Sequence, residues 1–390
     1  MNKKLATTIV LGATLGLFFS ANAQSEYNPI PSSVQMLNIA PEARGTGMGD
    51  VGVATTPDIN SQHWNPAKYA FMDSKSGVSI SITPWLRKLV NDINLFYLAG
   101  YYKIDSRNNV SASIRYFSLG DLVFYDEIGN EQGTYKPSEF AIDAAYALRL
   151  ATDWSGSVAL RFIHSDLGYQ QEDDSYSPGN AFAADIAFYY NKKISIAREQ
   201  SANLMFGVNI SNIGTKITYD DGNTNEYLPA NLKIGAGFWY DIDSYNRIGA
   251  AIDFNKLLVP TPTYRYTGEE TEEDAYTRRM KYYDQSVVKS IFTSFSDAPR
   301  GGEEEWEEVD IMGGIEYTYK KLFSARAGYH NNPENKGNLK YASVGLGVKY
   351  QMFNVDASYI FPVGQANSNS ALANTVRITL GFDLSKVLKK

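Results

Sequence analysis

The sequence predicts an all-β fold: a 14-stranded antiparallel transmembrane β-barrel of the outer membrane, with an N-terminal plug or hatch segment and a long, partly helical extracellular loop. Three observations predict it. The chain begins with the pattern of a secretory signal peptide. Apolar and polar residues then alternate with a period of two, in segments about as long as a membrane-crossing strand, roughly 9 to 11 residues. Short and long connections alternate between these segments, as in outer-membrane barrels.

The signal peptide is predicted at residues 1–23. Lys3 and Lys4 form its positive start, an apolar run follows, and Ala21-Asn22-Ala23 forms an A-x-A cleavage site. An uncleaved membrane anchor is the alternative. No cysteine follows the cleavage site, which excludes a lipoprotein anchor. No later stretch approaches the roughly 18 consecutive apolar residues of a membrane helix, so a helical membrane protein is excluded.

Residues 24–76 form the predicted hatch. The segment is rich in Pro, Gly, Asn and Ala, and its glycines cluster at 43–52, before Asn65-Pro66-Ala67. Glycines at alternate positions also occur in phosphate-binding loops, but no Gly-Lys-Ser/Thr follows them. A tightly folded plug is therefore favoured, because glycine permits sharp turns and close backbone approach inside a confined lumen.

The barrel is predicted over residues 77–390. In Val110–Tyr116, apolar residues alternate with Ser111, Ser113 and Arg115, so the two sets lie on opposite faces of a strand. The fourteen segments of this kind lie near 78–84, 93–104, 108–118, 138–150, 155–167, 181–191, 203–213, 229–241, 246–256, 308–320, 322–330, 340–350, 353–361 and 374–384.

A large secreted β-sandwich would show the same alternation, with its apolar face inward instead of outward. Two features favour the barrel. Charged residues such as Arg115, Asp143 and Arg161 lie mid-strand, which fits a polar lumen, and aromatic residues cluster near strand ends, as at the membrane interface. Alternation alone does not reveal which face points outward.

Residues 260–307 form the predicted extracellular loop, which is too long for an ordinary hairpin connection. Val287, Val288, Ile291, Phe292 and Phe295 fall on one helical face, with Ser286 as N-cap and Pro299 as stop. This helix either covers the barrel mouth or binds a partner. We expect the flanking acidic runs, 269–274 and 303–308, to keep the loop solvated and extended.

The composition excludes several classes of function. The 390 residues include no cysteine and three histidines, which removes thiolate metal sites, iron–sulfur clusters and cysteine nucleophiles; we expect no metal and no cofactor. A net charge of −7 argues against a nucleic-acid partner. His164 cannot easily engage Ser165, because adjacent strand residues point to opposite faces, so no catalytic residue is expected, although Asp166 shares its face. We expect His63 and His330 to form hydrogen bonds.

Several motifs resemble a known family. Residues 43–49 and 64–67 resemble the hatch of FadL-like outer-membrane proteins, and residues 228–235 resemble a strand entry of that family. More narrowly, residues 253–262, 289–299 and 326–329 resemble the PorV family, also called LptO, of the Bacteroidetes type IX secretion system.

The resemblance implies a non-enzymatic component of type IX protein secretion. Such a protein would bind cargo by the C-terminal domain of the cargo and shuttle it from the SprA translocon to the PorU sortase attachment complex, which includes PorZ and PorQ. Outer-membrane lipid, including lipopolysaccharide, would surround it. The alternative is a FadL-like transporter of hydrophobic small molecules.

Two sets of candidate residues follow. The partner-binding set comprises Val288, Ile291, Phe292, Phe295 and Asp297. The hatch set comprises Arg44, Gly45, Gly47, Met48, Gly49, Asn65 and Pro66. Buried aromatic anchors dominate interface energetics, so Phe292 and Phe295 are expected to contribute most to cargo binding.

Overall fold

The structure is a computed structural model of the chain. It describes residues 27–86, 92–125, 128–168, 176–197, 200–220, 222, 224–263, 271–364 and 375–386. The predicted signal peptide lies outside the described residues. No helix in the described part of the chain is both long and apolar enough to cross a membrane.

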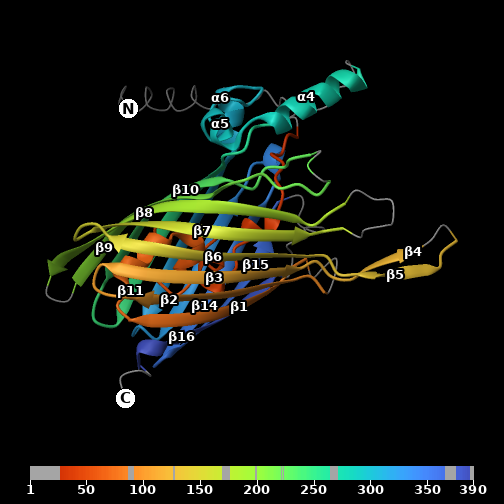
Figure 1. The fold of residues 1–390 in the computed structure, drawn as a ribbon. Coiled ribbons are helices and arrows are strands. Elements are labelled where there is room, and N and C mark those ends of the chain that lie inside the picture. The colour runs from red at the N-terminus through yellow and green to blue at the C-terminus, as the bar shows by residue number, and fades with distance from the viewer. Residues whose placement is uncertain are drawn as a thin grey trace, which may run out of the picture.

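Fourteen strands form one closed barrel (Figure 1). They are β1 (Ser76–Pro84), β2 (Asn94–Lys103), β3 (Asn108–Ser118), β6 (Ser138–Arg149), β7 (Trp154–Asp166), β8 (Gly179–Ala197), β9 (Gln200–Gly214), β10 (Asn231–Asp241), β11 (Asn246–Leu257), β12 (Val309–Tyr319), β13 (Phe323–Asn331), β14 (Lys340–Tyr350), β15 (Phe353–Pro362) and β16 (Val376–Asp383). Every neighbouring pair is antiparallel, and β1 pairs with both β2 and β16, which closes the sheet. Closure removes the free sheet edges that lipid could not hydrogen-bond.

The remaining elements lie in the lumen and in the connections. The lumen holds η1 (Gln35–Leu37), α2 (Ala43–Thr46), α3 (Ser61–Trp64) and η2 (Pro66–Phe71). The connections hold the hairpin β4 (Leu122–Tyr125) and β5 (Glu131–Tyr135), α4 (Glu272–Asp284), α5 (Val287–Thr293), α6 (Gly302–Glu307) and η3 (Glu334–Lys336), and η4 (Leu384–Lys386) follows the last strand. Figure 1 shows the β4–β5 hairpin projecting beyond one end of the barrel.

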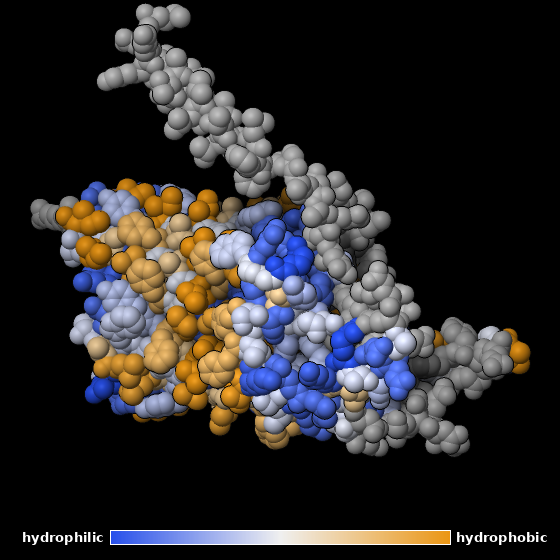
Figure 2. Space-filling view, turned by 90° about the horizontal axis from the view of Figure 1, so that it is seen from above, coloured by the Kyte–Doolittle hydropathy of each residue, from blue (hydrophilic) through white to orange (hydrophobic). Residues whose placement is uncertain are grey.

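The apolar face of each strand points outward. On β3, Ile114 and Tyr116 are 45% and 43% exposed, whereas the intervening Ser113 and Arg115 are 3% and 4% exposed. The same alternation covers the wall with apolar side chains (Figure 2). A soluble sandwich would bury the apolar set, so the structure confirms the membrane barrel and excludes the sandwich.

The two ends of the barrel differ. Short turns join β2 to β3, β6 to β7 and β10 to β11 at the end where β1 begins and β16 finishes, while the long connections lie at the opposite end. Outer-membrane barrels have short periplasmic turns and long extracellular loops. The α4–α6 segment and the β4–β5 hairpin therefore lie on the extracellular side.

The hatch packs backbone against backbone with the wall. A Cβ added at Gly314 of β12 would lie 2.3 Å from the carbonyl oxygen of Met48, and one at Gly328 of β13 would lie 2.0 Å from the carbonyl carbon of Met48. Gly49 has φ of +76°, a conformation that glycine adopts without strain, and its N–H donates to the Ser343 hydroxyl at 2.9 Å. Glycine is therefore required on both sides of this contact.

All fourteen predicted barrel strands are confirmed, with ends that shift by a few residues. The largest shift is at β8, which extends to Ala197 because it forms a long hairpin with β9. The β4–β5 hairpin, α4 and α6 were missed; α6 is described with the extracellular loop below. The β4–β5 hairpin and α4 lie in connections whose residues show no sustained apolar periodicity.

We expect Gly314→Ala to destabilise the protein and Gly313→Ala to be nearly neutral. The new methyl group at 314 would overlap Met48, whereas a Cβ at 313 meets nothing within 4 Å. Overpacking of this kind costs about 1–3 kcal/mol. Urea unfolding of the two variants in the same detergent measures the difference, and equal stabilities would contradict the tight hatch contact.

Candidate functional site

The extracellular loop is a small helical unit with defined caps. The Ser286 hydroxyl accepts from the Lys289 N–H at 3.3 Å and starts α5, as predicted. The Thr271 hydroxyl accepts from the Asp274 N–H at 3.2 Å and starts α4. Figure 1 shows α4, α5 and α6 standing outside the barrel wall.

One face of α5 and the turn after it are apolar and exposed. Val288, Phe292 and Phe295 are 66%, 75% and 50% exposed, and we call these three residues the α5 apolar face. The opposite side, with Ser290 and Ser294, is fully buried. The ring of Phe292 therefore points into solvent, whereas the ring of Phe295 is half covered and lies 5.8 Å from Nζ of Lys256 at the barrel rim. Of the other predicted partner-binding residues, Ile291 is half-buried at the edge of this face.

Tyrosines hold the loop to the barrel rim. The Tyr227 hydroxyl donates to the carbonyl oxygens of Tyr282 at 3.0 Å and Gln285 at 2.7 Å. The Tyr282 hydroxyl donates to the carbonyl oxygen of Pro260 at 2.9 Å, and its ring packs edge-on against Tyr227. Together with Val259 these rings form a buried apolar cluster, which fixes α4 and the start of α5.

Two buried glutamates attach α6 to the barrel rim and to neighbouring segments. We call Glu304 and Glu308, with their partners Lys256, Lys336 and Asn28, the acidic latch. Glu308 bonds Lys256 at 2.6 Å and Lys336 at 2.9 Å, and Glu304 bonds Lys336 at 2.6 Å and the side-chain amide of Asn28 at 3.0 Å. Glu304 and Glu308 are 2% and 5% exposed.

The expectation that the acidic run at 303–308 is solvated and extended is therefore wrong. These residues form a helix whose carboxylates meet lysines from β11 and from the connection between β13 and β14. Glutamates in the first turn after glycine are a helix-start signal that could have identified α6. The other acidic run, 269–274, lies partly outside the described residues, and its last residues begin α4.

Asp297 lies at the base of this unit and is partly buried. Burial raises the pKa of its carboxyl group to about 6, and the nearby Glu305 and Glu308 act in the same direction. By contrast, the bonds from Lys336 and Asn28 lower the pKa of Glu304 despite its burial.

Arg44 is the hatch residue with the most charged contacts. Its guanidinium bonds Asp58 within the hatch at 2.7 Å and Glu316 of β12 at 3.0 Å. Glu316 also pairs with Arg326 at 2.7 Å, which in turn pairs with Asp356 at 2.6 Å. This chain of buried ion pairs joins the hatch to three strands of the wall.

The other predicted hatch residues have packing roles. Gly45 lies against Trp64, and Gly47 lies against Gly345 of β14, where an added Cβ would come within 2.9 Å. Met48 is fully buried. Asn65 donates to the carbonyl oxygen of Phe188 at 2.9 Å and accepts from the Ala67 N–H at 3.0 Å, while Pro66 starts η2.

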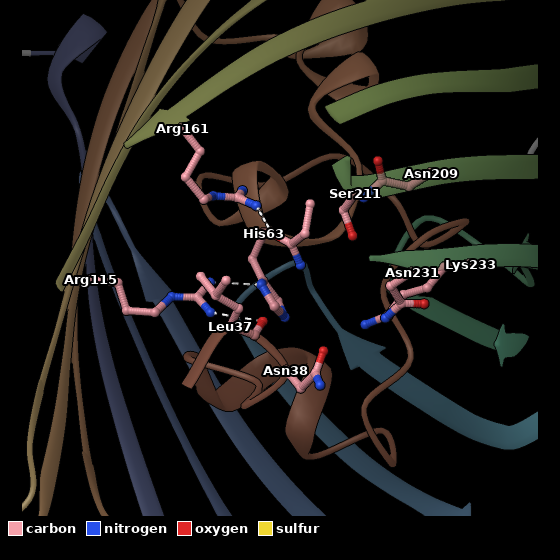
Figure 3. Close-up of a pocket in the computed structure, with 10 residues that line it drawn as sticks. Leu37, Asn38, His63, Arg115, Arg161, Asn209, Ser211, Asn231 and Lys233 are labelled. Carbon is pink, nitrogen blue, oxygen red and sulfur yellow. Dashed lines mark hydrogen bonds between the residues drawn. The ribbon is translucent and has the colours of Figure 1, made fainter. Parts of the chain in front are cut away.

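A small cavity lies between the hatch and the wall (Figure 3). Its lining is polar and cationic and comprises Leu37, Asn38, His63, Arg115, Arg161, Asn209, Ser211, Asn212, Asn231 and Lys233. Sequence reasoning placed Arg115 and Arg161 in the lumen but did not bring them together with His63. Their convergence depends on how the hatch crosses the lumen.

The histidines have structural contacts. His63 forms a hydrogen bond with Arg115, as expected. His164 Nδ1 lies 2.9 Å from Asn180 Oδ1. Ser165, on the other face of the strand, donates to Glu139. The expectation for His330 is wrong: its ring stacks on Tyr341 at 4.8 Å, and neither ring nitrogen has a hydrogen-bond partner among the described residues, with Nδ1 4.0 Å from the Asp50 carboxylate.

Comparison with known proteins identifies the family of the chain. A family model described as "Type IX secretion system protein PorV" matches residues 22–264. The chain is 10% identical to the Ralstonia pickettii toluene transporter TbuX, with a TM-score of 0.46 over 93% of this chain and 99% of that one. It is 8% identical to the P. putida toluene transporter TodX, with a TM-score of 0.47 over 89% and 99%. No curated protein matches the chain.

We expect Arg44→Met to lower the free energy of unfolding by about 3–5 kcal/mol, because it leaves the buried Glu316 and the partly buried Asp58 with fewer partners. Lys136→Met is the control, since Lys136 pairs with Asp121 in solvent, where such pairs contribute about 0–1 kcal/mol. Urea unfolding measures both, and similar losses would contradict the role of Arg44.

We expect the loop to be better protected at pH 5 than at pH 7. The pKa of Asp297 is raised above its unfolded value of 3.8, so its stabilising contribution is complete below that value and is lost as the pH rises through about 6. Hydrogen exchange of residues 271–308, corrected for the intrinsic rate, measures the effect. Asp297→Asn should weaken the pH dependence of this protection. If the variant keeps the wild-type pH dependence, other groups cause the effect.

Proposed function

Because the chain belongs to the PorV family of type IX secretion system proteins, it is an outer-membrane component of that system, and we propose that it is a cargo shuttle. In this proposal it binds secreted cargo by the C-terminal signal domain and carries it from the SprA translocon to the PorU sortase attachment complex with PorZ and PorQ. The shuttle forms and breaks no covalent bond.

The α5 apolar face is the observation that carries this proposal. Val288 and Phe292 are largely exposed on the extracellular side, and Phe295 is half exposed, with Lys256 of β11 lying 5.8 Å from the centre of its ring. Apolar clusters that stay exposed on an ordered loop are typical of partner-binding sites. Phe292 and Phe295 are the proposed anchors for the cargo domain, and Val288 and Ile291 extend the contact.

The loop also presents this face in a fixed geometry. The tyrosine cluster holds α4 and the start of α5, and the acidic latch holds α6 on the other side. A pre-ordered loop loses less conformational entropy when the partner binds. Asp297 is partly buried at the base, so in this proposal it supports the loop instead of pairing with a basic group of the cargo.

The polar lining of the cavity between hatch and wall argues against passage of a hydrophobic ligand through the lumen. A transporter of hydrophobic molecules needs an apolar route, whereas the cavity between hatch and wall is lined by arginine, lysine and asparagine side chains. In this proposal the cargo therefore stays outside the barrel lumen. The outward apolar band of the strands lies in outer-membrane lipid.

We expect Phe292→Ala and Phe295→Ala each to weaken cargo binding by about 2 kcal/mol, because buried aromatic anchors contribute this much at interfaces. Binding of a purified cargo C-terminal domain to the detergent-solubilised protein measures the effect. Tyr245→Ala is the matched control: this tyrosine is also exposed but lies in a short turn at the periplasmic end.

The transporter alternative gives the opposite pattern. If both phenylalanine variants keep full cargo binding and surface display of cargo, while uptake of an apolar solute falls, the shuttle proposal is wrong. A pull-down of the tagged wild-type protein from outer membranes should recover the translocon and the attachment complex.

A further inference from the structure

Two cations of the luminal wall, the buried Arg115 and the partly buried Lys233, form no ion pair with a carboxylate of the described residues. Arg115 of β3 is 4% exposed and donates to the carbonyl oxygens of Met36 and Leu37, at 2.9 and 3.0 Å, instead of to a carboxylate. Lys233 of β10 forms no hydrogen bond or ion pair with the described residues and lies 5.0 Å from the ring of Trp64. Arg161 differs, because it pairs with Asp185 at 2.8 Å and Asp143 at 3.4 Å.

His63 of the hatch offers an unused donor between these cations. Arg115 Nη2 lies 2.9 Å from His63 Nδ1, and a guanidinium nitrogen can only donate, so Nδ1 accepts and the ring proton resides on Nε2. His63 Nε2 is buried and has no hydrogen-bond partner in the part of the chain that the structure describes. Figure 3 shows the His63 ring between Arg115 on one side and Lys233 and Asn231 on the other.

These groups line one cavity, which contains no carboxylate. The whole chain is acidic, with a net charge of −7, so general composition does not explain a cluster of cations alone. An uncompensated buried charge is costly, and such charges are normally paired. Asp143 acts on Arg115 and Asp253 acts on Lys233 from a distance, but no carboxylate lines the cavity itself, which points to an anion from solution.

The size of the cavity restricts the occupant. Its enclosed space is about that of one water molecule, so a chloride ion fits it better than the larger phosphate or sulfate. Asn209 and Asn231 also leave their side-chain oxygens unbonded, so the lining contains acceptors as well as donors. Water is therefore the competing occupant.

We propose that this cavity binds one small inorganic anion of the size of chloride, held between His63 of the hatch and Arg115 and Lys233 of the wall. The anion offsets one of the two positive charges and accepts a hydrogen bond from the N–H at His63 Nε2. It thereby links the hatch to β3 and β10, whereas the Arg44 ion pairs link it to β12, β13 and β15.

Thermal unfolding of the detergent-solubilised full chain tests the proposal. Chloride replaces gluconate at constant ionic strength, so that screening stays equal. We expect the midpoint to rise with chloride by about 2–4 °C, because a ligand of the native state stabilises it. Lys233→Gln should abolish this rise and should unfold at a higher temperature than the wild type in gluconate, since it removes an uncompensated charge. Lys192→Gln, at an exposed lysine of β8, should keep the wild-type response.

Crystals grown with bromide give a direct second measurement. An anomalous peak in the cavity of the wild type, absent in Lys233→Gln, supports the site. Unfolding midpoints that do not respond to chloride, or a cavity without an anomalous peak, would mean that water alone fills it and would overturn the proposal. A wild-type response that Lys192→Gln also loses would assign the effect to general surface charge.

Discussion

Pairing between the hatch and the inward-facing charges of the wall is the interaction on which the rest of the structure depends. Closing the sheet in lipid sends every second side chain into the lumen, and many of these are charged. The hatch supplies partners: the N–H groups of Gly52 and Val53 donate to Asp253, Gln62 donates to Asp143, and Arg44 pairs with Glu316. Hatch and barrel are therefore one folded unit, because a barrel without the hatch would retain buried carboxylates with too few partners.

Much of this fold could be predicted from the sequence, because lipid on one side and a polar lumen on the other impose a period of two on every strand. A β-sandwich has the same period, so only the structure shows that Ile114 and Tyr116 point outward. The helix α4 escaped prediction for a related reason. Its residues, Glu272–Asp284, are polar on most sides and show no apolar stripe.

The candidate site was predictable only where its signals are local. The start of α5 at Ser286 and its apolar residues could be identified, since caps and helical spacing act over a few residues. The acidic latch could not, because Glu308 and Glu304 meet lysines 28 to 52 residues away. The cavity around His63 likewise combines residues of the hatch with four strands of the wall, and no pattern along the chain reports that meeting.

The path of the hatch has a consequence for biogenesis. Asn28 bonds the connections at Asn335 and Pro262 on the extracellular side, whereas Lys75 bonds Ser385 beside the periplasmic end of β16. The chain thus runs the full length of the barrel axis before its first strand begins. Threading such a segment through a finished cylinder would require moving it past the tight backbone contacts at Gly314 and Gly328. If β16 pairs with β1 after the hatch is already in place, no threading is needed. The pairing of the first and last strands is therefore expected to be the final part of the sheet to form.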